Sequence, residues 1–301
     1  MPTESWDWTG LWFPENDLDD MEVIGNRLFR AAVPVESDAE FKAYIFAAGA
    51  THSCGIRSVD NLLRRHGDLW TRRFEQKQSS VKKNIALLRR EVMRQVMARC
   101  EAISKLNLRK AATEGTITGA NAQIRLESTF RAASQLLALG FAFESEAVTR
   151  LGFEQIAWIY AIRNMLTPDE IESTSATGSV TDLKHVFPGA GRIYNRLSNL
   201  AHVSPKTHPR YLGASEGNTI VRIRMPSAVR ESMLLLIILL DAFLAVGEIC
   251  LSSAGLRCEN IDRETGHVRT KRIARTLVTD FSEVLRHDSG ESFASWWKVV
   301  P

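Results

Sequence analysis

The densest group of reactive polar side chains in this sequence lies between Tyr194 and His202. The string reads Tyr-Asn-Arg-Leu-Ser-Asn-Leu-Ala-His, with an arginine at 196 six positions before the histidine that closes it. A neutral imidazole can take a proton from a hydroxyl, and a guanidinium can hold negative charge that develops on phosphoryl oxygens. These residue types indicate chemistry on a phosphate, and the segment is the strongest candidate site.

The segment is predicted to be a helix from about residue 192 to residue 202, ended by Pro205. On an ideal helix Asn195, Ser198 and His202 share one face, whereas Arg196 lies about 120° away from His202. One straight helix therefore does not bring Arg196 and His202 together directly.

An arginine followed after five intervening residues by a histidine, on a helix of an all-α chain, resembles the motif of the HEPN (higher eukaryote and prokaryote nucleotide-binding) superfamily. The strings 146–154 and 194–202 are similar to those of its abortive-infection-type and uncharacterised bacterial branches. The resemblance covers roughly residues 118–254 and leaves the first 110 residues outside it.

The resemblance implies a helical bundle that forms a homodimer, with the catalytic residues Arg196 and His202 of both subunits at one composite cleft that cuts RNA without a metal or cofactor. It also implies that Tyr194, Asn195, Ser198 and Asn199 bind the substrate or orient the imidazole. Such an enzyme would be a toxin in antiviral defence, with an antitoxin or another defence component as its protein partner. Many members of the superfamily are non-catalytic, so an antitoxin or scaffold role stays open.

The helix predicted for residues 143–164 carries two notable charges. Arg150 and Glu154 are four residues apart on a predominantly apolar helix, a spacing that favours a structural ion pair bracing the bundle. The cysteines and histidines show no metal-ligand spacing, so we propose no metal site.

Charge is distributed unevenly although the formal net charge is only +3. Residues 1–50 hold ten acids against three bases, and residues 51–112 hold fifteen bases against five acids. A long amphipathic helix from residue 80 to about 111 carries many of these bases. One interpretation is a solvated helix face. The other is a non-enzymatic module that binds RNA or a protein, with Arg89, Arg90 and Arg94 as the RNA-binding residues.

The periodicity elsewhere is almost wholly helical and predicts an all-α bundle, divided into an N-terminal extension (1–112) and a HEPN-like bundle (113–301). Residues 1–35 look like an extended or loosely folded arm. The predicted helices cover 38–48, 53–66, 80–111, 120–139, 143–164, 181–186, 192–202, 226–255 and 271–286, and a small β-hairpin covers 210–214 and 218–225.

Membrane segments are not expected. The run Met233 to Val246 is highly apolar, but acids at 231, 241 and 248 interrupt it before the roughly 18–20 residues that a spanning helix needs. We interpret it as a buried core helix.

The N-terminus lacks a basic region followed by an apolar stretch, so a signal peptide is not predicted and a cytoplasmic location is expected.

Overall fold

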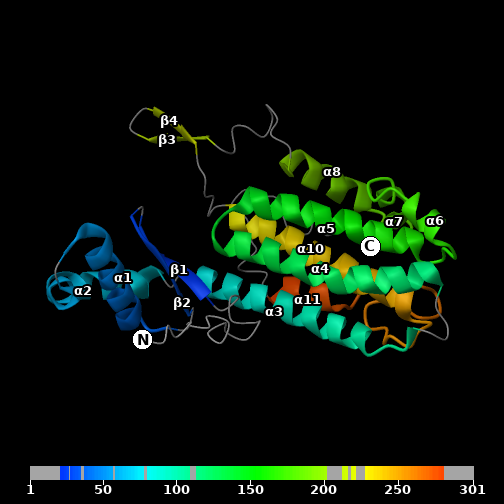
Figure 1. The fold of residues 1–301 in the computed structure, drawn as a ribbon, viewed down its shortest axis with the longest axis horizontal. Coiled ribbons are helices and arrows are strands. Elements are labelled where there is room, and N and C mark those ends of the chain that lie inside the picture. The colour runs from blue at the N-terminus through cyan, green and yellow to red at the C-terminus, as the bar shows by residue number, and fades with distance from the viewer. Residues whose placement is uncertain are drawn as a thin grey trace, which may run out of the picture. The chain divides into compact units, whose positions relative to one another are not determined.

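The computed structural model describes residues 21–26, 28–34, 37–56, 58–77, 80–108, 113–201, 212–215, 218–221 and 228–280. Within these residues the chain forms ten helices and two antiparallel pairs of strands, which confirms the predicted helical fold class (Figure 1). Contacts divide the chain into two compact units, residues 1–90 and 91–301, and the boundary falls inside the long helix α3, Ser80–Ser104.

A β-hairpin opens the described part of the first unit. Strands β1 (Met21–Gly25) and β2 (Arg30–Pro34) pair antiparallel along their full lengths. The Asn26 side chain accepts the backbone N–H of Leu28 at 2.7 Å and closes the turn. Of the two alternatives predicted for the arm, residues 21–34 are extended and not loosely folded, and they pair with each other as a hairpin.

Two helices follow, α1 (Ala39–Cys54) and α2 (Val59–Lys77). Asp38 caps α1, and its carboxylate accepts the backbone N–H of Phe41 at 2.6 Å. The predicted ends of both helices are wrong. The glycine that ends a helix is Gly55, which has a φ of 65°, whereas Gly67 lies inside α2.

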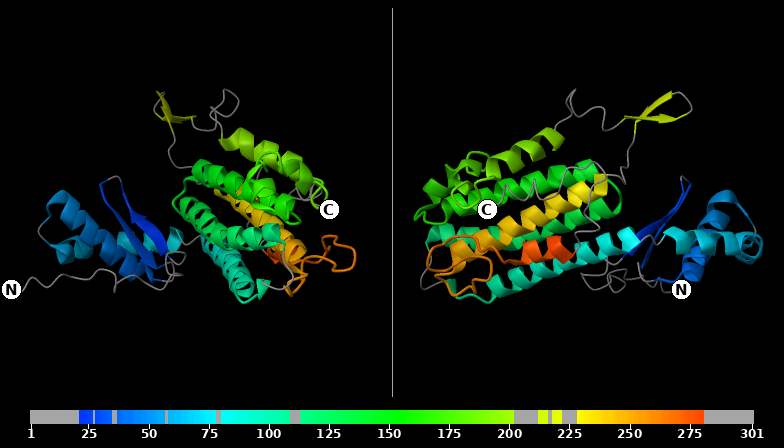
Figure 2. Two further views of the ribbon diagram at one scale, coloured as in Figure 1. Left: turned by 45° about the vertical axis from the view of Figure 1, so that its right-hand side comes forward. Right: turned by 180° about the vertical axis from the view of Figure 1, so that it is seen from behind.

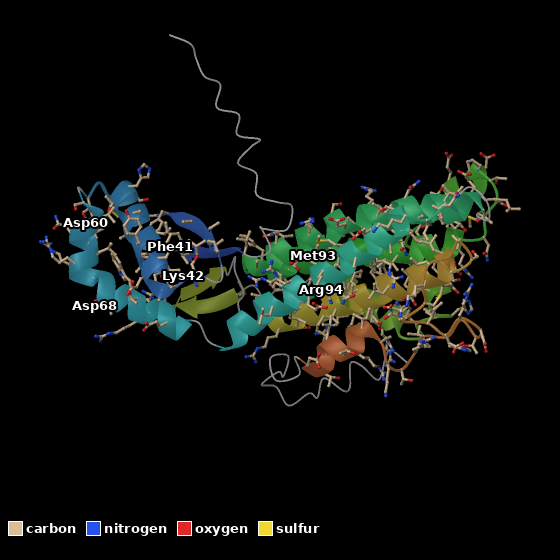
Figure 3. The ribbon with its side chains drawn as sticks, turned by 90° about the horizontal axis from the view of Figure 1, so that it is seen from below. Phe41, Lys42, Asp60, Asp68, Met93 and Arg94 are labelled. Carbon is tan, nitrogen blue, oxygen red and sulfur yellow. The ribbon has the colours of Figure 1, made fainter. Side chains whose placement is uncertain are left out.

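Aromatic rings form the core of this unit. The Phe46 ring lies 5.1 Å from the rings of Phe29 and Trp70 and 6.0 Å from that of Phe74, so the hairpin, α1 and α2 meet at one cluster. Figure 3 shows Phe41 and Lys42 as neighbours on α1. Phe41 is half exposed while Lys42 is buried, so apolar and charged residues do not divide simply between surface and core here.

The second unit is a helical bundle. The antiparallel helices α4 (Glu114–Ala138) and α5 (Ala142–Ile162) form the predicted helical hairpin, and α10 (Val229–Leu251) packs against both (Figure 2). The later part of α3 joins them, since the Met97 sulfur lies 3.8 Å from Arg131 on α4. The predicted helix 181–186 corresponds to α7 (Val180–Leu183), the final one to α11 (Ile273–Asp280), and α6 (Pro168–Glu172) was not predicted.

Helix α4 begins earlier than predicted. The predicted helix starts at residue 120, but residues 114–119 already form the first turns of α4 after the N-cap Thr113. A Cβ at Gly115 would lie 1.8 Å from the carbonyl oxygen of Ile162. Glycine is therefore required at this position by the close approach of α4 and α5, and not by a turn.

Helix α10 is the central helix of the bundle. Among the described residues it is the one helix long and apolar enough to cross a membrane, yet 94% of its most apolar window is buried inside the protein. This burial confirms the prediction of a core helix. The predicted small hairpin is also present, with β3 (Leu212–Ser215) and β4 (Asn218–Val221) paired antiparallel between α8 and α10.

Two acids on α10 are buried and form ion pairs. Asp241 accepts hydrogen bonds from two nitrogens of Arg272 at 2.7 and 2.8 Å, and Arg272 directly precedes α11. Glu248 accepts a hydrogen bond from Arg99 of α3 at 2.6 Å, and it also accepts from the backbone N–H groups of Asn260 and Ile261. The charges that interrupt the apolar run thus attach α3, α11 and the loop after α10 to the core helix.

Candidate functional site

Helix α8 (Ala190–Ala201) carries the candidate site and lies against α5 and the short helix α7 (Figure 1). Ala190, Ile193 and Leu197 form its buried stripe, at the spacing of three and four residues that one helix face requires. The apolar residues of the 190–197 segment therefore anchor the helix, and its polar residues fall on the remaining faces.

The predicted substrate-binding residues divide into two groups. Asn195 and Asn199 are exposed, and Ser198 is half-buried beside them. Tyr194 is half-buried on the flank that faces α5. His202 follows the last residue of α8 in the sequence and lies outside the described residues, so its predicted position on the face of Asn195 and Ser198 stays a prediction.

Tyr194 contacts the predicted ion pair on α5. The Arg150 guanidinium lies 3.0 Å from the Glu154 carboxylate, so the ion pair predicted from their spacing is present. The Tyr194 hydroxyl donates to Glu154 at 2.8 Å and accepts from Arg150 at 3.1 Å. Burial lowers the pKa of Arg150, but the hydrogen bond to Tyr194 and the charge of Glu154 outweigh it and raise that pKa. This triad fixes α8 on α5.

Arg196 faces α10. Its guanidinium forms an ion pair with the carboxylate of Glu231, in the first turn of α10, and the two side chains are 36% and 17% exposed. Glu231 was not identified from the sequence. It is 35 residues from Arg196, beyond the reach of helical periodicity, and the one local signal was its position at the start of an apolar helix, where a carboxylate is favoured.

A buried acid lies near the start of α5. Glu146 is fully buried and accepts the Ser232 hydroxyl of α10 at 2.7 Å. The start of α10 therefore places one residue, Glu231, against α8 and the next, Ser232, against α5. Three helices are joined there by polar contacts that sequence reasoning did not identify.

The predicted RNA-binding arginines of α3 do not share one open face. Arg89 is 3% exposed, Arg90 is half-buried, and Arg94 is exposed and hydrogen-bonded to Glu91 through two nitrogens. Figure 3 shows Arg94 beside the buried Met93. Arg99 of the same helix is also buried and paired with Glu248, so it does not belong to a solvated face of α3.

No protein-family model, curated protein or solved structure matches the chain. Within the described part of the chain, no group of three or more His, Cys, Asp or Glu side chains is arranged to hold a metal ion. The arrangement that the geometry does supply is a polar helix edge on α8, with one arginine that is partly exposed and held by a carboxylate. Such an edge can bind an anionic group through the guanidinium and amide side chains.

Proposed function

We propose that this protein is a metal-independent endoribonuclease of HEPN type, a toxin that acts in antiviral defence. In this proposal RNA binds along α8, and Arg196 and His202 from two copies of the chain meet at a composite site. The observation that carries the proposal is the edge of α8, where Arg196 keeps 36% of its side chain exposed beside the exposed Asn195 and Asn199.

The chemistry needs two groups of the chain. Neutral His202 removes the proton of an RNA 2′-hydroxyl, whose oxygen attacks the adjacent phosphorus as the bond to the 5′-oxygen breaks. Arg196 stabilises the negative charge on the phosphoryl oxygens, and Asn195 or Asn199 hydrogen-bonds the phosphate. The departing 5′-oxygen takes a proton from the His202 imidazolium or from water, so the products are a 2′,3′-cyclic phosphate and a 5′-hydroxyl end. A dimer supplies Arg196 from one copy and His202 from the other, because the two lie on different faces of one ideal helix.

The test is incubation of the purified protein with total RNA in EDTA. We expect cleavage by the wild type and a loss of about 100-fold or more in His202→Ala and Arg196→Ala. Arg192→Ala is the matched control, because Arg192 is an exposed arginine on the same helix and takes no part in the proposed chemistry. Cleavage by His202→Ala at the wild-type rate would refute the mechanism, and circular dichroism must show that each variant is folded.

A second candidate function is a non-catalytic module, an antitoxin or scaffold, that binds RNA or a protein. The observation in its favour is the basic surface of α2, where Arg64, Arg65, Arg72 and Arg73 are all exposed. Reversal of Arg72 and Arg73 to glutamate should then weaken RNA binding and reduce its salt dependence. Arg94→Glu tests α3 in the same way, whereas Arg89 is buried and its reversal would test folding instead.

A further inference from the structure

The ion pair between Arg196 and Glu231 joins the helices on either side of the β3–β4 hairpin. Arg196 lies in the middle of α8, and Glu231 lies in the first turn of α10, where the helix dipole favours a negative charge. The inference below rests on the proposed function, because it concerns how Arg196 binds an RNA phosphate.

The contact is partly closed to solvent. The Glu231 oxygen that meets Arg196 is buried, and so is the Arg196 Nε atom. Charges interact more strongly where water is excluded, so this pair is stronger than one on an open surface. The Arg196 side chain nevertheless keeps 36% exposure, so an anion has access to part of it while Glu231 stays in place.

The neighbouring charges are mixed. Ser232, next to Glu231, donates to the buried Glu146, so a second carboxyl group lies at this end of the bundle. Arg230 precedes Glu231 and is half-buried. A phosphate that approaches Arg196 therefore meets a guanidinium whose charge is already offset by the Glu231 carboxylate.

We propose that Glu231 controls the binding of RNA phosphates at Arg196. Its carboxylate takes up part of the hydrogen-bonding capacity of the guanidinium and repels the negatively charged phosphate. An RNA phosphate therefore has to bind in spite of this repulsion or displace the carboxylate from Arg196. Glu231 is thus a built-in competitor that keeps the affinity of α8 for RNA low. Any partner that draws Glu231 away, or a second subunit that does so on dimerisation, would raise that affinity.

The test measures binding of a 2′-O-methyl single-stranded RNA, which has no free 2′-hydroxyl and so cannot be cleaved. Glu231→Gln keeps the shape of the side chain and removes its charge. We expect it to tighten binding by about threefold to tenfold at one fixed salt concentration. The matched control is Glu114→Gln, which removes the same charge from the first turn of α4 and should leave the affinity unchanged.

The same substitution in an Arg196→Ala background separates this effect from a general change in charge. We expect the Arg196→Ala protein to bind weakly and Glu231→Gln to give it no gain. A gain of equal size in both backgrounds, or no gain in the wild-type background, would overturn the role of Glu231.

Failure of the proposed function gives a different pattern. If Arg196→Ala binds the RNA as tightly as the wild type, α8 is not the RNA site and both proposals fail. If Arg196→Ala binds weakly but Glu231→Gln binds like the wild type, the RNA site stands and only the control by Glu231 is wrong. If Glu231→Gln tightens binding while His202→Ala still cleaves RNA, the control by Glu231 stands and the catalytic mechanism is wrong.

Discussion

The buried carboxylate of Glu248 is expected to be a main determinant of stability in the helical bundle. One oxygen accepts from Arg99 Nη2 at 2.6 Å and from the Asn260 side chain at 2.7 Å. The other accepts the backbone N–H groups of Asn260 at 2.7 Å and Ile261 at 2.9 Å. Glu248→Gln keeps the size of the side chain but removes the charge and replaces one accepting oxygen with a donating amide nitrogen.

The magnitude follows from these contacts. The Arg99 side chain is 8% exposed, so Glu248→Gln leaves a nearly buried positive charge without its counter-ion, a loss of about 3–5 kcal/mol. If the new amide nitrogen points at the backbone, two buried N–H groups lose their acceptor, at about 1–3 kcal/mol each. These losses overlap, so we expect the free energy of unfolding of the bundle to fall by about 3–5 kcal/mol in total.

Urea unfolding followed by circular dichroism measures this change, and hydrogen exchange at Asn260 and Ile261 locates it. Glu101→Gln is the matched control. Glu101 lies on the same helix as Arg99, but it is exposed and forms its ion pair with Lys105 in solvent, so its substitution should leave the unfolding midpoint in place. If Glu248→Gln shifts the midpoint no more than Glu101→Gln does, the argument from buried pairing is wrong.

Three further predictions concern two glycines and a buried thiol. Gly67→Ala should stabilise the first unit by about 0.5–1 kcal/mol in thermal unfolding, because Gly67 lies inside α2 and a Cβ there meets side-chain atoms no closer than 3.8 Å. Gly115→Ala should destabilise the bundle in the same assay, since its Cβ would lie 1.8 Å from the Ile162 oxygen, and equal stability would contradict the close packing of α4 and α5. Burial raises the pKa of the Cys250 thiol to about 12, so iodoacetamide at pH 8 should label the exposed Cys54 and leave Cys250 unlabelled in the folded protein; rapid labelling of Cys250 would show that its helix opens.

Local patterns in the sequence were sufficient for most of the helices. The three- and four-residue apolar spacing along α3 identified it, because an amphipathic helix must repeat its buried side with that period. The spacing of Arg150 and Glu154 likewise predicted their ion pair, since residues four apart on a helix are neighbours. Interactions within one helix can be predicted because the backbone geometry is the same in every protein.

Glycines gave weaker predictions because one residue type serves several purposes. The predicted helices end at residue 66 and begin at residue 120, yet Gly67 lies inside α2 and Gly115 allows α4 and α5 to approach closely. Gly55 ends α1, although it lies inside the helix predicted for residues 53–66. The choice among these roles depends on the backbone conformation and on the neighbouring helix.

The candidate site likewise combines features that the local sequence predicts with contacts that depend on the packing of helices. The sequence by itself determined that α8 is a helix and that Asn195 and Ser198 share one of its faces, because helical geometry alone sets both. Only the tertiary structure decided that Arg196 meets Glu231, that Tyr194 bridges Arg150 and Glu154, and that Arg89 and Arg99 are buried instead of solvated. These outcomes depend on which helices pack together, because the partners of a charge and its exposure to water are set by residues far away in the sequence.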